Sequence, residues 1–124
     1  MMEQLSALVL TYNEEDNIGD CLDSINWIDR IVVVDSYSDD QTKEICQRYK
    51  NVDFYENDFN DFASQRNFGL EKIKTAWVLV VDADERVTDD LKNEIIKTLN
   101  IPLAEGYEIS RKNYFLGKWI KYCG

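Results

Sequence analysis

Short apolar runs alternate with amphipathic segments along most of the chain. The runs at 5–10, 30–34, 52–55, 77–81 and 106–110 are rich in β-branched and aromatic residues and predict five strands. Apolar residues at helical spacing predict helices at about 16–26, around 45–49, and at about 62–74 and 88–99. The positions expected to be buried in the last two helices are Phe62, Ala63, Leu70, Ile73, Leu91, Ile95 and Leu99. Strands that alternate with helices predict an α/β fold with a mostly parallel sheet and right-handed crossovers.

Short polar side chains precede the predicted helices, where they can accept hydrogen bonds from the first free N–H groups. Asn13 is the candidate cap of the first helix, Asp39 or Asp40 of the second, and Thr88 of the fourth.

Polar residues follow three of the predicted strands, and the last of these groups contains a candidate site for a cation. Asp82 and Asp84 come directly after the apolar run 77–81, one residue apart. Two neighbouring carboxylates repel each other unless a cation lies between them, and Mg²⁺ or Mn²⁺ holding a phosphate suits such a pair. Because the chain is rich in acidic residues, an isolated Asp-x-Asp pair carries little information, and its place at a strand end is what singles it out.

Two other strand ends are expected at the same edge of the sheet. Tyr12, Asn13 and Glu14 follow the first strand, and Asp35 follows the second. Ligands of open α/β sheets bind outside the carboxyl ends of the strands, so these residues are expected to converge with the aspartate pair.

Each of these side chains has both a binding and a structural interpretation. Tyr12 can stack on a nucleobase or cover the first helix. Asp35 can accept a hydrogen bond from a base or a ribose, or it can cap a turn. Arg66, in the third predicted helix, can serve as a fixed cation at the rim or lie on a solvated face. Their convergence on one edge favours a binding site.

The composition narrows the classes of partner. The net charge of −10 and the pI of about 4.4 argue against nucleic acid and against electrostatic docking on an anionic membrane. The absence of histidine excludes Ser-His-Asp and Cys-His catalysis and every histidine metal site. Three widely spaced cysteines indicate free thiols in a reducing compartment. No apolar run reaches the ~18–20 residues of a membrane span, and no signal peptide is visible, so a cytoplasmic location is expected.

Four segments, taken together, resemble the inverting family 2 glycosyltransferases of the GT-A fold. They are VLTYNEEDNI at 9–18, IVVVDSYSDDQT at 31–42, RNFG at 66–69 and VVDADE at 80–85. The segment SRKNYFLGKW at 110–119 further resembles the branch that adds sugars to the lipopolysaccharide core and to other surface glycans. The resemblance implies a Rossmann-like GT-A sheet flanked by helices, with residues 1–124 forming the nucleotide-sugar-binding part and the acceptor half absent.

The same resemblance implies roles for individual residues. Its nucleotide-contacting positions are Thr11, Tyr12, Glu14, Asp35, Arg66 and Asp82. Asp35 would read the base, Asp82 would face the ribose, and Asp84 would hold Mg²⁺ or Mn²⁺. The implied substrates are a UDP-linked sugar donor and a glycan or lipid-linked acceptor. The general base is expected beyond Gly124, and the full-length protein is expected to be cytoplasmic, with peripheral attachment to the inner face of the cell membrane as an alternative.

The sequence departs from the family pattern at one turn. Tyr37 stands where these enzymes usually have glycine, so a positive φ there would strain the backbone.

Three rival functions remain open. A haloacid-dehalogenase-type phosphatase would need Thr or Val where Arg86 stands, and its acids would follow the first strand. A sugar nucleotidyltransferase would need a glycine-rich first loop. A nucleotide-binding or interaction fragment without turnover, whose apolar tail docks on a partner, is the third alternative. Separately, the aromatics Tyr114, Phe115 and Trp119 are candidates for self-association if they are exposed.

Overall fold

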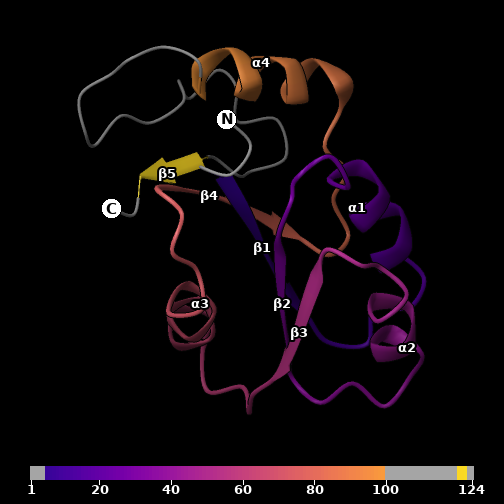
Figure 1. Ribbon diagram of the computed structural model, residues 1–124. Coiled ribbons are helices and arrows are strands. Elements are labelled where there is room, and N and C mark those ends of the chain that lie inside the picture. The colour runs from indigo at the N-terminus through magenta and orange to yellow at the C-terminus, as the bar shows by residue number, and fades with distance from the viewer. Residues whose placement is uncertain (1–4, 100–119, 123–124) are drawn as a thin grey trace.

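The computed structural model describes residues 5–99 and 120–122, which form a five-stranded sheet with helices on both faces (Figure 1). In chain order the elements are β1 (Leu5–Thr11), α1 (Ile18–Ser24), β2 (Ile31–Asp35), α2 (Thr42–Cys46), β3 (Val52–Glu56), α3 (Phe62–Leu70), β4 (Trp77–Asp82), α4 (Asp89–Leu99) and β5 (Ile120–Tyr122). The strand order is β3-β2-β1-β4-β5. The first four strands are mutually parallel and β5 runs antiparallel to β4, which confirms the α/β prediction.

The two faces of the sheet are covered by different helices. Alternate residues of a strand point to opposite faces, so Ala7 and Val9 of β1 pack with α1 and α4, whereas Leu8 packs on the side of α3. Figure 1 shows α1 and α2 on one side of the sheet and α3 on the other. Burial on both faces explains why β2 is a continuous Ile-Val-Val-Val run.

The strand register brings the carboxyl ends of three strands together. Thr11 of β1 pairs with Asp35 of β2, and Leu10 of β1 pairs with Asp82 of β4. We call the rim formed by these strand ends and the loops that follow them the carboxyl edge. Its existence confirms that the three polar strand ends share one side of the sheet.

The third helix differs from its prediction. It ends at Leu70 rather than near Lys74, and Phe62 and Ala63 are exposed instead of buried. The helix turns Gln65 and Gly69 toward the sheet. Gly69 allows this close approach, because a Cβ at that position would collide with Leu8 Cδ1 and lie 3.1 Å from Val34 Cγ2.

The fourth helix agrees with its prediction. Leu91, Ile95 and Leu99 are buried on one face. The hydroxyl of Thr88 accepts a hydrogen bond from the N–H of Leu91 at 3.1 Å, as expected of a cap.

The caps of the first two helices were only partly anticipated. The residue at the start of α1 is Asn17, not Asn13, and its side chain makes no capping bond. At α2 the capping position is Gln41 rather than Asp39 or Asp40, and its side chain makes no capping bond, although Asp40 just before it accepts a hydrogen bond from the N–H of Thr42 at 2.9 Å.

Some predictions lie outside the described residues. These are the strand at 106–110, the aromatic tail with Tyr114, Phe115 and Trp119, and the third cysteine, Cys123. Strand β5 was not predicted. Within 5–99 and 120–122, no helix combines the length and the apolar character that crossing a membrane requires.

Candidate nucleotide-sugar site

The loops after β1 and β2 are joined by hydrogen bonds at the carboxyl edge. The N–H of Asn13 donates to Ser38 Oγ at 2.7 Å, and the side-chain oxygen of Asn13 accepts from the N–H of Asp39 at 2.9 Å. Further along, the N–H of Glu14 donates to Thr42 Oγ1 at 2.9 Å. The two loops therefore form one connected surface rather than two independent turns.

Asp35 lies beneath this surface and has 0% exposure. Its Oδ1 accepts from the hydroxyls of Thr11 and Ser38, each at 2.6 Å, and its Oδ2 accepts from the N–H of Ser38 at 2.7 Å. Buried carboxylates require such partners, because leaving water without them is costly. The structure thus places Asp35 among groups that hold the two loops in position.

The other residues of the first loop have mixed environments. Glu14 is half-buried, and its Oε1 accepts from Asn17 Nδ2 at 3.1 Å, so part of its carboxylate serves the loop itself. Tyr12 is 57% exposed and is free to present its ring to a ligand.

In the second loop, partial burial alone would raise the pKa of Asp40, but hydrogen bonds from Thr42 and from the N–H of Glu15 lower that pKa.

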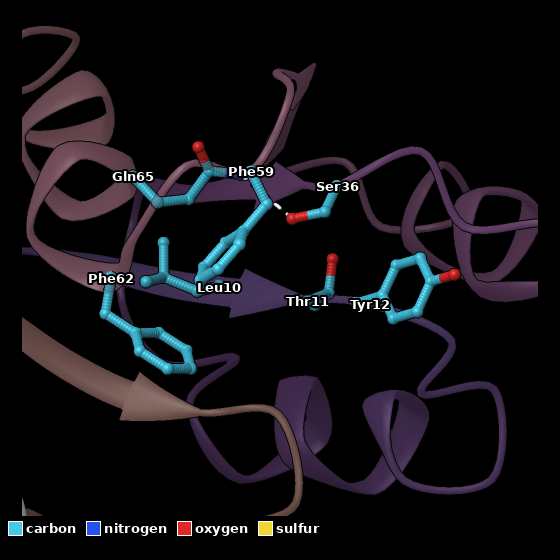
Figure 2. Close-up of a pocket in the computed structure, with 7 residues that line it drawn as sticks. All are labelled: Leu10, Thr11, Tyr12, Ser36, Phe59, Phe62 and Gln65. Carbon is cyan, nitrogen blue, oxygen red and sulfur yellow. Dashed lines mark hydrogen bonds between the residues drawn. The ribbon is translucent and has the colours of Figure 1, made fainter.

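A pocket of about 400 Å³ opens at the end of β1. We call it the aromatic pocket; it is lined by Leu10, Thr11, Tyr12, Ser36, Phe59, Phe62 and Gln65 (Figure 2). Figure 2 shows Tyr12 and Phe62 at opposite ends, with Leu10 and the Phe59 ring between them. The rings of Phe59 and Phe62 meet edge to face with centroids 5.0 Å apart. The size and apolar lining are those of a small-ligand site.

The floor of the aromatic pocket is a buried amide. Gln65 is 1% exposed, and its Nε2 donates to Ser36 Oγ at 3.1 Å and to the carbonyl of Asn57 at 3.0 Å. Its Oε1 accepts from Asn57 Nδ2 at 2.9 Å. Gln65 therefore ties α3 to the loops that follow β2 and β3.

The aspartate pair lies on the turn after β4, beside the aromatic pocket. Asp82 and Asp84 are exposed, whereas Ala83 between them is buried. The turn is closed by two bonds: the N–H of Asp82 donates to Glu85 Oε1, and the N–H of Glu85 donates to the Asp82 carbonyl, both at 2.9 Å. Because Asp82 pairs with Leu10 of the pocket wall, the acids and the pocket occupy adjacent strands.

These two carboxylates fit a cation that a phosphate also holds. Across the described ranges, no group of three or more His, Cys, Asp or Glu side chains is arranged to hold a metal by itself. Mg²⁺ typically takes one or two protein carboxylates and completes its shell with water and substrate phosphate oxygens. The exposed pair at the strand end has the donor chemistry for that kind of site.

The arginines Arg66 and Arg86 have different surroundings. Arg66 is half-buried on α3, one residue beyond Gln65, and it does not line the aromatic pocket. Arg86 follows the aspartate turn, and its Nη2 lies 3.3 Å from Asn17 Oδ1 and 3.6 Å from Asp20 Oδ2. Arg86 thereby links the aspartate turn to α1.

Sequence reasoning missed five of the residues that line the aromatic pocket, namely Leu10, Ser36, Phe59, Phe62 and Gln65. A signal for two of them was present: Phe59 and Phe62 are isolated aromatics in a polar stretch that immediately precedes or begins a helix. No comparable signal marks Ser36 or Gln65, because their importance comes from contacts between different elements.

The parallel sheet with its polar carboxyl edge defines an α/β domain of the Rossmann-like GT-A class. The family model described as Glycosyl transferase family 2 matches residues 6–120, and the chain belongs to this family. The lipopolysaccharide core biosynthesis glycosyltransferase LpsC of Rhizobium meliloti (strain 1021) is 33% identical over 119 residues, covering 91% of this chain and 44% of LpsC. The prophage-derived glycosyltransferase SunS of Bacillus subtilis (strain 168) is 33% identical over 96 residues, covering 75% of this chain and 23% of SunS.

Solved structures agree with this assignment. Staphylococcus aureus TarS 1–349, in complex with UDP-GlcNAc, matches with a TM-score of 0.67 and 28% identity over 77% of this chain and 31% of that one. The mannosyltransferase PcManGT of Pyrobaculum calidifontis, in complex with GDP-Man and Mn²⁺, matches with a TM-score of 0.69 and 25% identity over 91% of this chain and 38% of that one. The chain thus spans less than half the length of these relatives.

Proposed function

We propose that the chain is the donor-binding part of an inverting, metal-dependent glycosyltransferase that takes its sugar from a UDP-linked donor. The observation that carries this proposal is the juxtaposition of the aromatic pocket with exposed Asp82 and Asp84 at the carboxyl edge. A nucleobase needs an apolar cleft with aromatic faces, and a diphosphate needs a cation held by carboxylates. The carboxyl edge has candidate binding groups for both parts of that ligand, and the two sets of groups are adjacent.

The solved relatives support a donor of this chemical class. TarS was crystallised with UDP-GlcNAc, and PcManGT with GDP-Man and Mn²⁺, so both hold a nucleoside diphosphate sugar. The acceptor proposed for the whole protein is a glycan or a lipid-linked glycan, in keeping with the name of LpsC. A lipid-linked acceptor would place the reaction at the inner face of the cell membrane.

Each residue of the edge has a proposed task. Thr11, Tyr12 and Glu14 shape the nucleotide side of the site, Asp82 faces the ribose, and Arg66 supplies positive charge near the nucleotide. Asp84 would hold Mg²⁺ or Mn²⁺, which when bound neutralises the negative charge that grows on the departing diphosphate. The acceptor hydroxyl is deprotonated by a carboxylate that we assign to the part of the relatives this chain does not match.

Titration with UDP in the presence and absence of Mn²⁺ tests the metal role of Asp84. The parent chain should bind UDP more tightly with Mn²⁺, and Asp84→Asn should lose that dependence. Asp29→Asn is the matched control, because Asp29 is an exposed aspartate that precedes β2 at the opposite end of the sheet. If Asp84→Asn and Asp29→Asn respond equally to Mn²⁺, Asp84 does not hold the metal.

A second function, nucleotide binding without turnover, is favoured by one observation. The chain matches only 44% of LpsC, so more than half of that relative has no counterpart here, and we assign acceptor binding to the unmatched part. Measuring UDP-glucose hydrolysis beside UDP binding separates the two functions. Binding without hydrolysis supports a donor-binding fragment, whereas hydrolysis that stops in Asp84→Asn supports a catalytically competent chain.

A further inference from the structure

Four of the described residues that line the aromatic pocket have polar side chains, and three of them are committed elsewhere. The hydroxyl of Thr11 donates to buried Asp35 at 2.6 Å. The hydroxyl of Tyr12 points away from the centre of the pocket in Figure 2. Both amide hydrogens of Gln65 are used, since Nε2 donates to Ser36 Oγ and to the Asn57 carbonyl. Ser36 is the remaining polar side chain.

The direction of the Gln65–Ser36 hydrogen bond is set by Asn57. A backbone carbonyl can only accept, so the Gln65 atom 3.0 Å from the Asn57 oxygen must be the amide nitrogen. The opposite amide orientation would place two oxygens against each other. Ser36 Oγ therefore accepts a hydrogen bond from Gln65, and its own hydroxyl group is left to donate to another acceptor.

Ser36 presents this donor to the pocket interior. Figure 2 shows its oxygen directed toward the space beside Phe59, and no described acceptor receives its proton. A ligand group that meets a hydroxyl donor most favourably is a carbonyl oxygen. An amino group in the same place offers no acceptor, so the Ser36 hydroxyl proton would be left without a partner in the pocket.

We infer that Ser36, oriented by Gln65, selects a nucleobase that carries a carbonyl oxygen over one that carries an amino group at the same position. The inference rests on the proposed donor site and names the residue that sets its base preference. Asp35 acts as a positioning residue, because its carboxylate is fully buried against Thr11 and Ser38 and does not line the pocket. The difference lies at the ring position where uracil has a carbonyl and cytosine an amino group, and where guanine and adenine differ in the same way; at that position uracil and guanine satisfy the preference.

The aromatic walls contribute affinity without this selectivity. Tyr12, Phe59 and Phe62 are 57%, 46% and 67% exposed, so their rings are accessible to a flat ligand. Every base has a π-face, and stacking on aromatic side chains is tolerant of base identity. Removing an aromatic wall should weaken all nucleotides by similar factors, whereas removing the Ser36 hydroxyl should change their ratio.

The test compares UDP and CDP, whose bases have a carbonyl and an amino group at the same ring position. Affinities are measured calorimetrically on the whole chain with saturating Mn²⁺. The parent should favour UDP by roughly three- to tenfold, the effect of one hydrogen bond. Ser36→Ala should bring the ratio close to one by weakening UDP, and Ser36→Thr, which keeps the hydroxyl, should retain it. Ser64→Ala is the control, since Ser64 is exposed on α3 and does not line the pocket.

Phe62→Ala completes the design, because Phe62 is exposed and its loss does not threaten the core. It should weaken UDP and CDP by the same factor, about fivefold or more. The inference is overturned if Ser36→Ala keeps the parent ratio while remaining folded, or if Phe62→Ala leaves both affinities unchanged. If the parent binds neither nucleotide, the proposed donor site fails as well, so the two failures are distinguishable.

Discussion

The hydroxyl of Thr11 donates a 2.6 Å hydrogen bond to Oδ1 of Asp35, and this buried contact joins the ends of β1 and β2 directly beneath the aromatic pocket. Ser38 adds two further donors to the same carboxylate. The loops that would contact a nucleotide are thus both held by hydrogen bonds to the Asp35 side chain. A substitution at Asp35 should therefore lower the stability of the fold, and it should affect nucleotide binding only as a consequence of that loss.

We expect Asp35→Asn to lower the free energy of unfolding by about 1–3 kcal/mol, the cost of an unsatisfied buried polar group. In the parent, the N–H of Ser38 and the Thr11 hydroxyl both donate to the Asp35 carboxylate. In the variant, the new amide would turn its own hydrogens toward one of these two donors. Urea denaturation measures the change.

Asp39→Asn is the matched control for this prediction, because Asp39 is exposed and the hydrogen bond described for it is made by its backbone N–H. Its free energy of unfolding should stay close to that of the parent. A role for Asp35 in direct base recognition would show the opposite pattern: Asp35→Asn would weaken UDP binding while leaving the denaturation curve in place.

Gly69 permits the closest contact between α3 and the sheet. We expect Gly69→Ala to destabilise the fold by about 1–3 kcal/mol, the usual effect of an extra group in a packed interior. The added Cβ would collide with Leu8 Cδ1 and crowd Val34 Cγ2 at 3.1 Å. Thermal denaturation followed by circular dichroism measures the loss.

Gly19→Ala provides the comparison, since the same atom would there meet only Ile45 Cγ2 at 3.8 Å and Tyr49 Oη at 3.9 Å. Gly19 lies inside α1, and replacing glycine by alanine in a helix gains up to about 1 kcal/mol. The two variants should therefore shift the melting temperature in opposite directions. Equal shifts would show that the approach of α3 to the sheet does not depend on Gly69.

The elements that could be predicted from the sequence are those whose pattern is set by local packing. The Val32–Val34 run is buried on both sides of the sheet, and α4 has one continuous apolar face, so both were identifiable. The aspartate pair was identifiable because parallel strands share a carboxyl edge. In each case the relevant contact is dictated by the periodicity of one segment.

The parts that could not be predicted depend on how separate elements meet. Apolar spacing favours Phe62 as a buried residue of α3, but the close approach at Gly69 turns a different face, with Gln65, toward the sheet. Gln65 is tolerated in the interior because Asn57 and Ser36 satisfy its amide. Neither partner is visible from the spacing of the helix alone.

The cysteines of the core should be unreactive in the folded chain. Burial raises the pKa of both the Cys21 and the Cys46 thiol to about 12, and both residues have 0% exposure. Because the thiolate is the reacting species, a thiol reagent should label neither residue in native protein at pH 8 and both in denaturant. Peptide mapping by mass spectrometry assigns the labelled sites. Rapid native labelling of either residue would contradict its burial.

The same raised pKa values predict weaker folding at alkaline pH. Between pH 9 and 12 the unfolded thiols ionise while the folded ones stay protonated, so the unfolded state binds fewer protons and the free energy of unfolding falls as pH rises. Tyr49 adds to this trend, because burial and its hydrogen bond to Asp23 raise its pKa to about 12. Urea titrations at pH 8 and 10 measure the slope, which should be shallower in the double variant Cys21→Ala/Cys46→Ala.

Tyr37 adopts a positive φ of 60°, as expected if this turn needs the conformation that glycine provides. A side chain in the left-handed region costs roughly 1–2 kcal/mol, and the greater freedom of glycine in the unfolded chain offsets part of that gain. We therefore expect Tyr37→Gly to raise the free energy of unfolding by about 1 kcal/mol, or the melting temperature by roughly 3–6 °C.

Tyr37→Ala separates backbone strain from the loss of the ring. Tyr37 is 53% exposed, so removing its ring should cost little, while alanine keeps the unfavourable φ. Alanine should thus leave the melting temperature near that of the parent, and only glycine should raise it. If alanine and glycine shift it equally, the effect comes from the side chain and the turn stores no strain. UDP titration of the Tyr37→Gly variant then tests whether the ring of Tyr37 contacts the nucleotide. If the variant is more stable than the parent but binds UDP more weakly, the ring makes that contact.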